Sequence, residues 1–282
     1  MKLVRYGTKG HEKPGLIDSD GHVRDLSGTI EDIGPGQLSA SSLSFLLSCD
    51  QTALPLISGT PRFGCPIARV GKLIAIGLNY SDHAAEAGSP LPDEPIIFLK
   101  ATSCIQGPDD DIMLPQGSTK TDWEVELGVV IGTTTRYVTK EDALNRVAGY
   151  CIVNDVSERE YQLERGGTWD KGKGCDTFGP IGPWLVTTDE ITNPQHLNLW
   201  LEVNGQRMQD GNTRNMIFGV AELISYASHF MTLLPGDIIT TGTPAGVGLG
   251  MRPPTFLKAG DTMALGVTGL GRQHQRVVPF SL

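Results

Sequence analysis

The sequence predicts an α+β fold in which β-strands predominate, with a small N-terminal α+β domain (residues 1–65) ahead of a larger domain (residues 66–282). The 282 residues include 35 glycines and 18 prolines, which favours many short strands joined by turns. Only residues 218–233 show the apolar spacing of a long helix. The segment S-G-T-P-R-F-G-C-P (58–66) interrupts all periodicity, so we place the domain boundary there.

Composition and charge exclude several classes of protein. The formal net charge of −9 argues against a nucleic-acid surface and against a basic membrane-binding face. The five cysteines form no C-x-x-C pair, which is typical of a reducing compartment. No apolar signal region follows Met1, and no apolar run is long enough to cross a bilayer. We therefore expect a cytoplasmic protein.

The N-terminal residues predict an accessory domain without chemistry of its own. Residues 2–6 form an apolar strand pattern, and residues 16–26 predict a hairpin that turns at Asp20-Gly21. Residues 39–49 predict an amphipathic helix with a serine cap. The polar residues of this part form no cluster.

The first candidate site follows the boundary. Residues 72–76 predict a strand that leads into a short helix near Ser81, where His83 and Glu86 are three residues apart. Because positions i and i+3 share a helix face, the carboxylate could hold the imidazole or share a proton with it. A surface contact without function is the alternative. The strand of residues 95–100 then ends in Lys100.

Three carboxylates predict a metal site. Glu124 and Glu126 are one residue apart in an apolar strand pattern, so both point to one face of the sheet. Asp155 stands at the end of a second strand pattern, residues 150–153. Three oxygen ligands with open positions suit Mg²⁺ or Mn²⁺. The alternative is a half-exposed strand with solvated glutamates and a capping aspartate.

A polar helix and a glycine-rich loop come next. The helix, residues 157–165, carries Arg159, Gln162 and Arg165. In the loop, G-x-x-x-x-G-K ends at Lys173, but Gly174 replaces the Ser or Thr of a phosphate-binding loop, and no strand precedes the motif. We therefore exclude a nucleoside triphosphate site and expect a loop that lets a lysine approach a ligand.

The C-terminal part predicts further strands and one more candidate. Residues 197–203 form a strand pattern followed by an Asn204-Gly205 hairpin turn. After the helix of residues 218–233, the strand D-I-I-T-T (237–241) opens into a Gly/Pro turn that carries Thr243. A hydroxyl and backbone N–H groups in such a turn could hold a carboxylate. The six histidines show no H-x-x-H pattern, so we expect no zinc site of that kind.

Together these segments resemble the fumarylacetoacetate hydrolase superfamily. The resemblance covers residues 72–282 and rests on motifs that appear in the family's order: G-L-N-Y-S-D-H-A-A-E (77–86), P-I-I-F-L-K (95–100), D-W-E-V-E-L-G-V-V-I-G (122–132), N-D-V-S-E-R-E-Y-Q (154–162), K-G-K-G-C-D-T-F-G-P (171–180) and T-T-G-T-P-A-G-V-G (240–248). It implies a mixed β-sandwich roll, a Mg²⁺ or Mn²⁺ ion, a 2-oxo acid substrate, and a homodimer or higher homo-oligomer.

The resemblance also implies roles for individual residues. Matched by position, the metal ligands are Glu124, Glu126 and Asp155, the water-handling dyad is His83 and Glu86, and the active-site lysine is Lys173. Thr243 matches the threonine that holds the substrate carboxylate, and Arg159, Gln162 and Lys100 complete the expected substrate-binding set. The segment S-E-R-E-Y-Q departs from the family's usual T-A-R-D-x-Q, so we expect the surroundings of Arg159 to differ from those in most relatives.

The implied reaction is hydrolysis of the C3–C4 bond of a 2,4-dioxo acid. The opening M-K-L-V-R-Y-G and the run E-R-E-Y-Q-L-E-R-G-G-T-W (158–169) look most like bacterial hydrolases of 2,4-diketo-3-deoxy-L-rhamnonate or L-fuconate, whose relatives often carry a ureidoglycolate lyase label. The alternatives are ureidoglycolate lyase, oxaloacetate or 2-oxo acid decarboxylase, and fumarylpyruvate or acylpyruvate hydrolase. A binding protein without catalysis has no need of the dyad.

Overall fold

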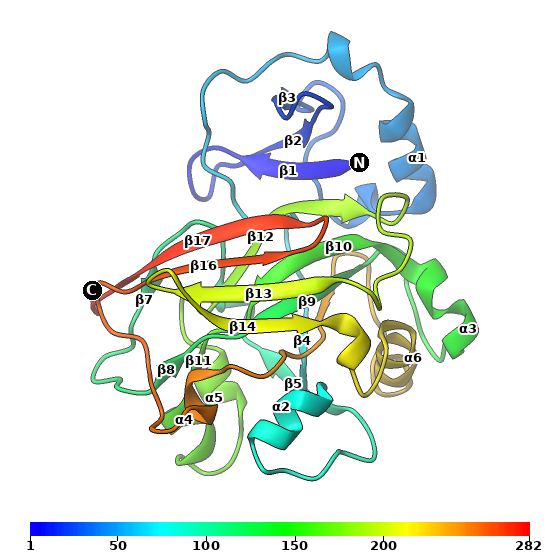
Figure 1. The fold of residues 1–282 in the computed structure, drawn as a ribbon. Helices are drawn as coiled ribbons and strands as arrows, with labels where there is room; N and C mark the ends of the chain where they lie inside the picture. The colour runs from blue at the N-terminus through cyan, green and yellow to red at the C-terminus, as the bar shows by residue number, and fades with distance from the viewer.

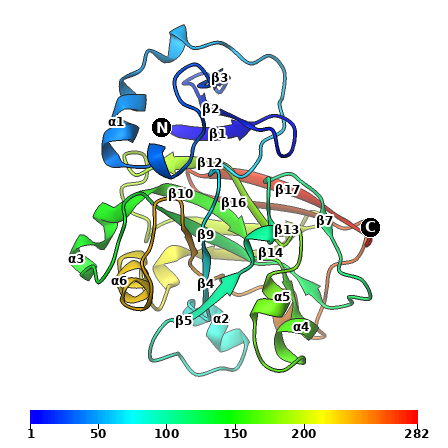
Figure 2. The same cartoon turned by 180° about the vertical axis from the view of Figure 1, so that it is seen from behind.

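The computed structural model describes residues 1–282, and two β-sheets dominate it (Figures 1 and 2). The larger sheet has the strand order β3-β2-β1-β12-β10-β9-β15-β4-β5, with β6 beside β12. Its strands are β1 (Lys2–Tyr6), β2 (Lys13–Ile17), β3 (Val23–Asp25), β4 (Leu73–Gly77), β5 (Ile96–Lys100), β6 (Ile105–Gln106), β9 (Val125–Ile131), β10 (Val147–Asn154), β12 (Gly179–Thr187) and β15 (Ile238–Thr240).

The smaller sheet has the order β14-β13-β16-β17-β7 and lies across one face of the larger sheet, in front of β9 and β10 in Figure 1 and behind them in Figure 2. Its strands are β7 (Ile112–Met113), β13 (Asn198–Val203), β14 (Gln206–Asn212), β16 (Thr262–Val267) and β17 (Gly271–Val278), while β8 (Thr121–Asp122) and β11 (Ser157–Glu158) form a separate pair. One apolar core joins Val129 and Ile152 of the larger sheet to Leu201 and Leu265 of the smaller one. The mixed, mostly β sandwich is confirmed.

Six short helices cover the edges of the sandwich: α1 (Ala40–Ser48), α2 (Ser81–Glu86), α3 (Lys140–Ala143), α4 (Arg159–Leu163), α5 (Asp170–Lys173) and α6 (Val220–Phe230). In α1 the predicted cap is present, since the Ser39 side chain accepts a hydrogen bond from the backbone N–H of Ser42. In α6 the buried residues recur at helical spacing: Val220, Leu223, Ile224, Ala227 and Ser228. No helix is long and apolar enough to span a membrane.

The N-terminal strands extend the main sheet. β1 pairs antiparallel with β12, where Leu3 lies opposite Leu185, and β2 and β3 continue outward from it. Figure 1 shows this part of the chain at one end of the molecule, beyond β12. Strands from before and after residue 65 pair within this one sheet, so the sheet itself marks no domain boundary. The division into two domains at residue 65 stays a prediction.

The central hairpin of β9 and β10 positions the candidate site. All seven residues of β9, V-E-L-G-V-V-I, are buried, as expected for a strand covered on both faces. Gly128 permits the tight pairing with β10, because a Cβ atom there would lie 2.8 Å from the Cys151 Sγ. The register places Glu126 opposite Val153 and Val125 opposite Asn154. The last residues of β10 therefore run beside the glutamates.

Candidate active site

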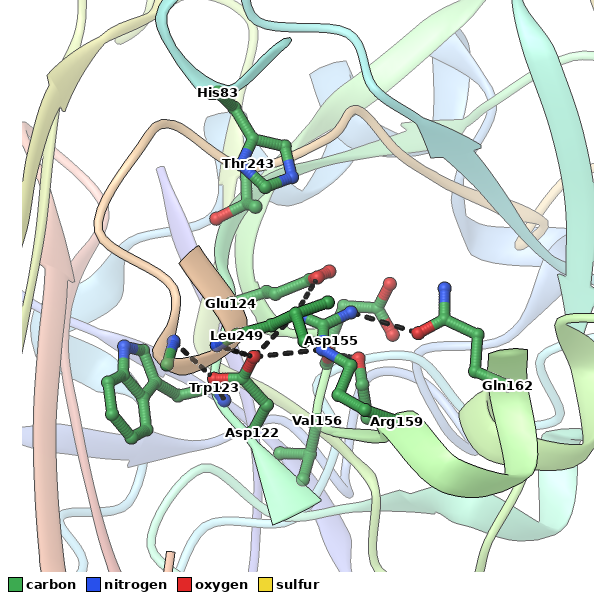
Figure 3. A network of polar contacts seen from close by, with 12 residues as sticks. His83, Asp122, Trp123, Glu124, Asp155, Val156, Arg159, Gln162, Thr243 and Leu249 are labelled. Carbon is green, nitrogen blue, oxygen red and sulfur yellow. Dashed lines mark hydrogen bonds and ion pairs between the residues drawn. The ribbon is translucent and has the colours of Figure 1, made fainter. Parts of the chain in front are cut away.

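A cavity of about 240 Å³ opens above this hairpin and is lined by eight of the ten predicted site residues, all except Glu86 and Lys100. Glu124, Glu126 and Asp155 lie at its floor, and Phe98, Leu163, Trp169, Val247 and Leu249 form an apolar wall. Figure 3 shows His83 and Thr243 on one side of the open space and Glu124, Asp155 and Gln162 on the other.

The three carboxylates meet because of strand pairing. Glu126 belongs to β9, Glu124 directly precedes that strand, and Asp155 directly follows β10. The backbone N–H of Asp155 donates a 2.9 Å hydrogen bond to the Glu124 carbonyl. One oxygen from each side chain lies within 4.8 Å of the others, and all three residues are buried. This all-oxygen donor set fits Mg²⁺ or Mn²⁺.

Buried cations hold two of these carboxylates. The Lys173 Nζ lies 2.6 Å from the Glu124 Oε2 and 2.7 Å from the Asp155 Oδ2. The Arg159 Nη2 lies 2.7 Å from the Glu124 Oε1. Burial by itself would raise the pKa of Glu124, but the charges of Lys173 and Arg159 hold that pKa well below its usual range.

Glu126 has a different environment. Its Oε2 accepts hydrogen bonds from the Thr240 hydroxyl and, at 2.8 Å, from the Gly242 N–H, while its Oε1 accepts none. Burial and then the negative charges of Asp155 and Glu124 raise the pKa of Glu126 well above its usual range. Counted with every group ionised, the four buried acids of the site (Asp122, Glu124, Glu126 and Asp155) and the three buried cations beside them (Lys100, Arg159 and Lys173) carry one excess negative charge. A divalent cation fits this excess and the open oxygen.

The predicted dyad is formed on α2. The His83 Nδ1 lies 3.3 Å from the Glu86 Oε2, and the other Glu86 oxygen accepts a 3.0 Å hydrogen bond from the Gly246 N–H. Because the carboxylate only accepts, it holds the imidazole proton on Nδ1 and leaves Nε2 as an acceptor. His83 lines the cavity, so the arrangement can take up a proton there.

The predicted substrate-binding residues divide into two groups. Gln162 and Thr243 line the cavity: the Gln162 Oε1 accepts from the Arg159 Nη1 at 3.0 Å, and the Thr243 hydroxyl donates to the Val125 carbonyl at 2.9 Å. Lys100 does not line it, because its Nζ is buried against the Asp155 Oδ1 at 2.5 Å. In this position Lys100 provides a positive charge beside Asp155. Its predicted role in substrate binding stays a prediction.

Arg165, the second arginine of the predicted polar helix, lies away from the cavity. Its side chain is exposed and pairs with Glu160 at 2.6 Å, on the outer surface of the loop after α4. Of the polar residues on that predicted helix, only Arg159 and Gln162 reach the cavity.

Asp122 was not predicted from the sequence as a site residue, although its side chain connects two segments of the site. Its buried carboxylate accepts hydrogen bonds from the Arg159 Nε at 2.8 Å and from the backbone N–H groups of Gly248 and Leu249 at 2.7 and 2.9 Å (Figure 3). Asp122 thus ties the loop after β15 to the arginine that holds Glu124. The alternation D-x-E-x-E over residues 122–126 is the signal that could have indicated it, since all three acids share one strand parity.

Two aromatic residues of the wall were also not predicted. Trp169 and Phe98 pack edge to face with ring centroids 5.3 Å apart, and the Lys173 Nζ lies 5.4 Å from the centre of the Phe98 ring. Gly77 makes room for the indole, because a Cβ there would lie 2.2 Å from a Trp169 ring carbon. The sequence offers no local signal for this contact between β4 and the glycine-rich loop.

Comparison with known proteins identifies the family. Residues 72–278 match the model of the fumarylacetoacetate hydrolase C-terminal domain. A Burkholderia ambifaria protein named only as a hydrolase is 62% identical over 276 residues, 98% of each chain. The fumarylacetoacetate hydrolase of Exiguobacterium antarcticum has a TM-score of 0.87 and 34% identity, covering 99% of this chain and 100% of that one. A Sphingobium maleylpyruvate hydrolase with manganese and pyruvate bound has a TM-score of 0.82 and 28% identity over 100% of both chains. This chain therefore belongs to the fumarylacetoacetate hydrolase family.

Proposed function

We propose that the protein is a metal-dependent hydrolase that cleaves the C3–C4 bond of a 2,4-dioxo acid, giving pyruvate and a second acid. The observation that carries the proposal is one cavity that is lined both by a buried cluster of three carboxylates and by His83, the imidazole of a His-Glu pair. The carboxylates suit a divalent cation, and the pair suits the activation of water. A binding site without chemistry needs only the first.

Glu124, Glu126 and Asp155 are the proposed ligands of Mg²⁺ or Mn²⁺. When bound, the cation supplies a Lewis acid for the substrate's carboxylate and 2-oxo oxygens and for the negative charge that develops on them. The Sphingobium maleylpyruvate hydrolase holds manganese and pyruvate. This relative supports our proposals that the cation is Mg²⁺ or Mn²⁺ and that one product is pyruvate.

The protein's own groups act on the water and on the scissile bond. The His83 Nε2 takes a proton from a water that adds to the C4 carbonyl, and Glu86 stabilises the resulting imidazolium through Nδ1–H. The C3–C4 bond then breaks, and its electron pair forms the enolate of pyruvate. The Lys173 ammonium faces this charge from the cavity floor. The proton held by His83 is returned to C3, which gives pyruvate, and C4 with the added hydroxyl becomes the carboxyl group of the second acid.

Thr243 and Gln162 are proposed to orient the substrate. The Gln162 carboxamide oxygen is engaged by Arg159, so its N–H₂ group is left to donate toward the cavity. The Thr243 hydroxyl is held by Val125 and by the Gln209 Nε2 at 2.8 Å, which keeps it at the wall of the cavity. The Gln162 N–H₂ group can donate to the outer oxygen of the substrate carboxylate, and the Thr243 hydroxyl can do so by turning its proton from the Val125 carbonyl to the ligand.

As substrate we propose 2,4-diketo-3-deoxy-L-rhamnonate or L-fuconate. The motif resemblance supports this choice, and so do the apolar side chains of Val247 and Leu249, which line the cavity together with His83. The acyl end of these acids carries one hydroxyl and one methyl group, and the methyl suits such a wall. We further propose that the protein acts as a homodimer, which light scattering tests.

The test is pyruvate release from a panel of 2,4-dioxo acids, with Mn²⁺ and with a chelator, beside oxaloacetate and ureidoglycolate. Metal-dependent pyruvate formation from a sugar-derived diketo acid is the expected result. Carbon dioxide from oxaloacetate alone would instead indicate a decarboxylase, and glyoxylate from ureidoglycolate a lyase. Either outcome would contradict the proposed attack of water at C4.

A further inference from the structure

A second chamber adjoins the cavity. It has a volume of about 350 Å³ and shares His83, Ala87, Val247 and Leu249 with the first. Its far side is formed by the loop that follows β15, including Arg252. The two spaces therefore meet at the dyad and continue past it.

Arg252 is the one cation of this chamber, and it has no partner. The side chain is exposed, no carboxylate lies within 4.0 Å of it, and it makes no hydrogen bond with the protein. Glu86 is the only acid in the chamber, but its two oxygens are engaged by His83 and by the Gly246 N–H. In a protein with a net charge of −9, an unpaired guanidinium beside a cavity is available to a ligand.

The order of the lining residues sets the direction of a bound substrate. The three carboxylates line only the first cavity, His83 lines both spaces, and Arg252 lines only the second. If the dyad acts at C4, as the proposed function requires, atoms C1 and C2 lie toward the carboxylates. The acyl end beyond C4 then extends past His83 into the second chamber.

We propose that Arg252 determines substrate specificity by donating hydrogen bonds to an oxygen-bearing group, a hydroxyl or a carboxylate, at the acyl end of the substrate. This inference rests on the proposed function for the direction of the substrate. A planar guanidinium with five donors suits acceptor oxygens of either kind. Val247, Leu249 and Met251 in the same chamber provide apolar contacts for the carbons between C4 and that group.

The kinetic test compares acylpyruvates that differ only at the acyl end: acetylpyruvate, 2,4-diketo-3-deoxy-L-rhamnonate and fumarylpyruvate. In Arg252→Gln we expect the kcat/KM of the last two, relative to acetylpyruvate, to fall roughly tenfold or more, the range of a lost charge-assisted hydrogen bond. The loss should lie mainly in KM, and Arg252→Lys should recover part of it. Arg272→Gln, at an exposed arginine near the Trp200 ring, is the matched control.

A binding test does not depend on turnover. The Mn²⁺-loaded protein is titrated calorimetrically with 2-oxoadipate and with 2-oxohexanoate, which have equal chain lengths and differ only in the terminal carboxylate. We expect wild-type protein to prefer 2-oxoadipate and Arg252→Gln to lose that preference.

The two tests separate the two proposals. If no dioxo acid is cleaved but the preference for 2-oxoadipate depends on Arg252, the proposed function fails and the role of Arg252 stands. If dioxo acids are cleaved but Arg252→Gln leaves the substrate ratios unchanged, the role of Arg252 is overturned. A wild-type protein that shows no preference between the two 2-oxo acids overturns it as well. A larger loss for fumarylpyruvate than for the rhamnonate derivative would identify a carboxylate as the group recognised.

Discussion

Replacing Glu126 by glutamine should stabilise the metal-free protein while removing its metal site. At an effective dielectric constant of about 20, two unit charges separated by the 4.8 Å limit of this cluster repel by roughly 3.5 kcal/mol. Glu126 faces two such neighbours and has no cation of its own within salt-bridge distance, although Lys173 offsets part of the repulsion. Glutamine keeps an oxygen that can accept from Thr240 and Gly242.

We therefore expect Glu126→Gln to gain about 1–3 kcal/mol in free energy of unfolding in the presence of a chelator. Thermal unfolding with a chelator should show a Tm increase of about 2–6 °C. Calorimetric titration with Mn²⁺ should show an affinity more than about a hundredfold weaker, because a direct ligand is lost. Stability and metal binding thus change in opposite directions.

Asp155→Asn is the matched control. Asp155 accepts from both Lys100 and Lys173, so its neutralisation leaves a buried ammonium without a counter-charge. This variant should lose about 3–5 kcal/mol of stability in chelator and should also lose Mn²⁺. If Glu126→Gln were destabilised like Asp155→Asn, or if it kept wild-type affinity for Mn²⁺, the electrostatic reasoning about Glu126 would be refuted.

Three further predictions concern other residues. His83→Ala should keep the Mn²⁺ affinity but lower kcat about 10²–10⁴-fold, as steady-state kinetics on the best dioxo acid would reveal; an unchanged kcat would exclude proton transfer by His83. Arg62→Gln should lose about 1–3 kcal/mol of stability at pH 7. The Arg62 guanidinium pairs with the carboxylates of Glu12 and Asp110. Burial would raise the pKa of each carboxylate, but the guanidinium holds both pKa values below their usual range. At low pH the unfolded chain binds more protons than the folded protein does. The difference in unfolding free energy between wild type and Arg62→Gln should therefore shrink as the pH falls below about 4.5. Thermal unfolding of both proteins at about pH 7 and about pH 3 checks this. Gly248→Ala would place a Cβ 1.9 Å from the Thr255 carbonyl oxygen, so the loop must move, and we expect a lower Tm and a raised KM. Gly28→Ala is the control, because the added Cβ there meets open space.

Much of the fold and of the candidate site could be predicted from local patterns. The strand alternation that pairs Glu124 with Glu126, the helix spacing that pairs His83 with Glu86, and the Asn204-Gly205 turn all depend on neighbours within four residues. Asn204 and Gly205 do have positive φ values of 51° and 77°, as a two-residue hairpin loop requires. Such features are encoded where they occur, because backbone periodicity alone relates their side chains.

By itself, the sequence determined which chemical groups the protein carries, in which order, and on which kind of element. Only the tertiary structure decided which of them share a cavity. Lys100 pairs with Asp155 and does not line the cavity, and Arg165 lies on the exposed surface. Arg252, unremarkable in the sequence, lines the chamber next to His83. The physical reason is that these contacts join segments far apart in the chain, so they depend on the register of β9 with β10 and on loops packed across the sheet. No spacing within a single segment carries that information.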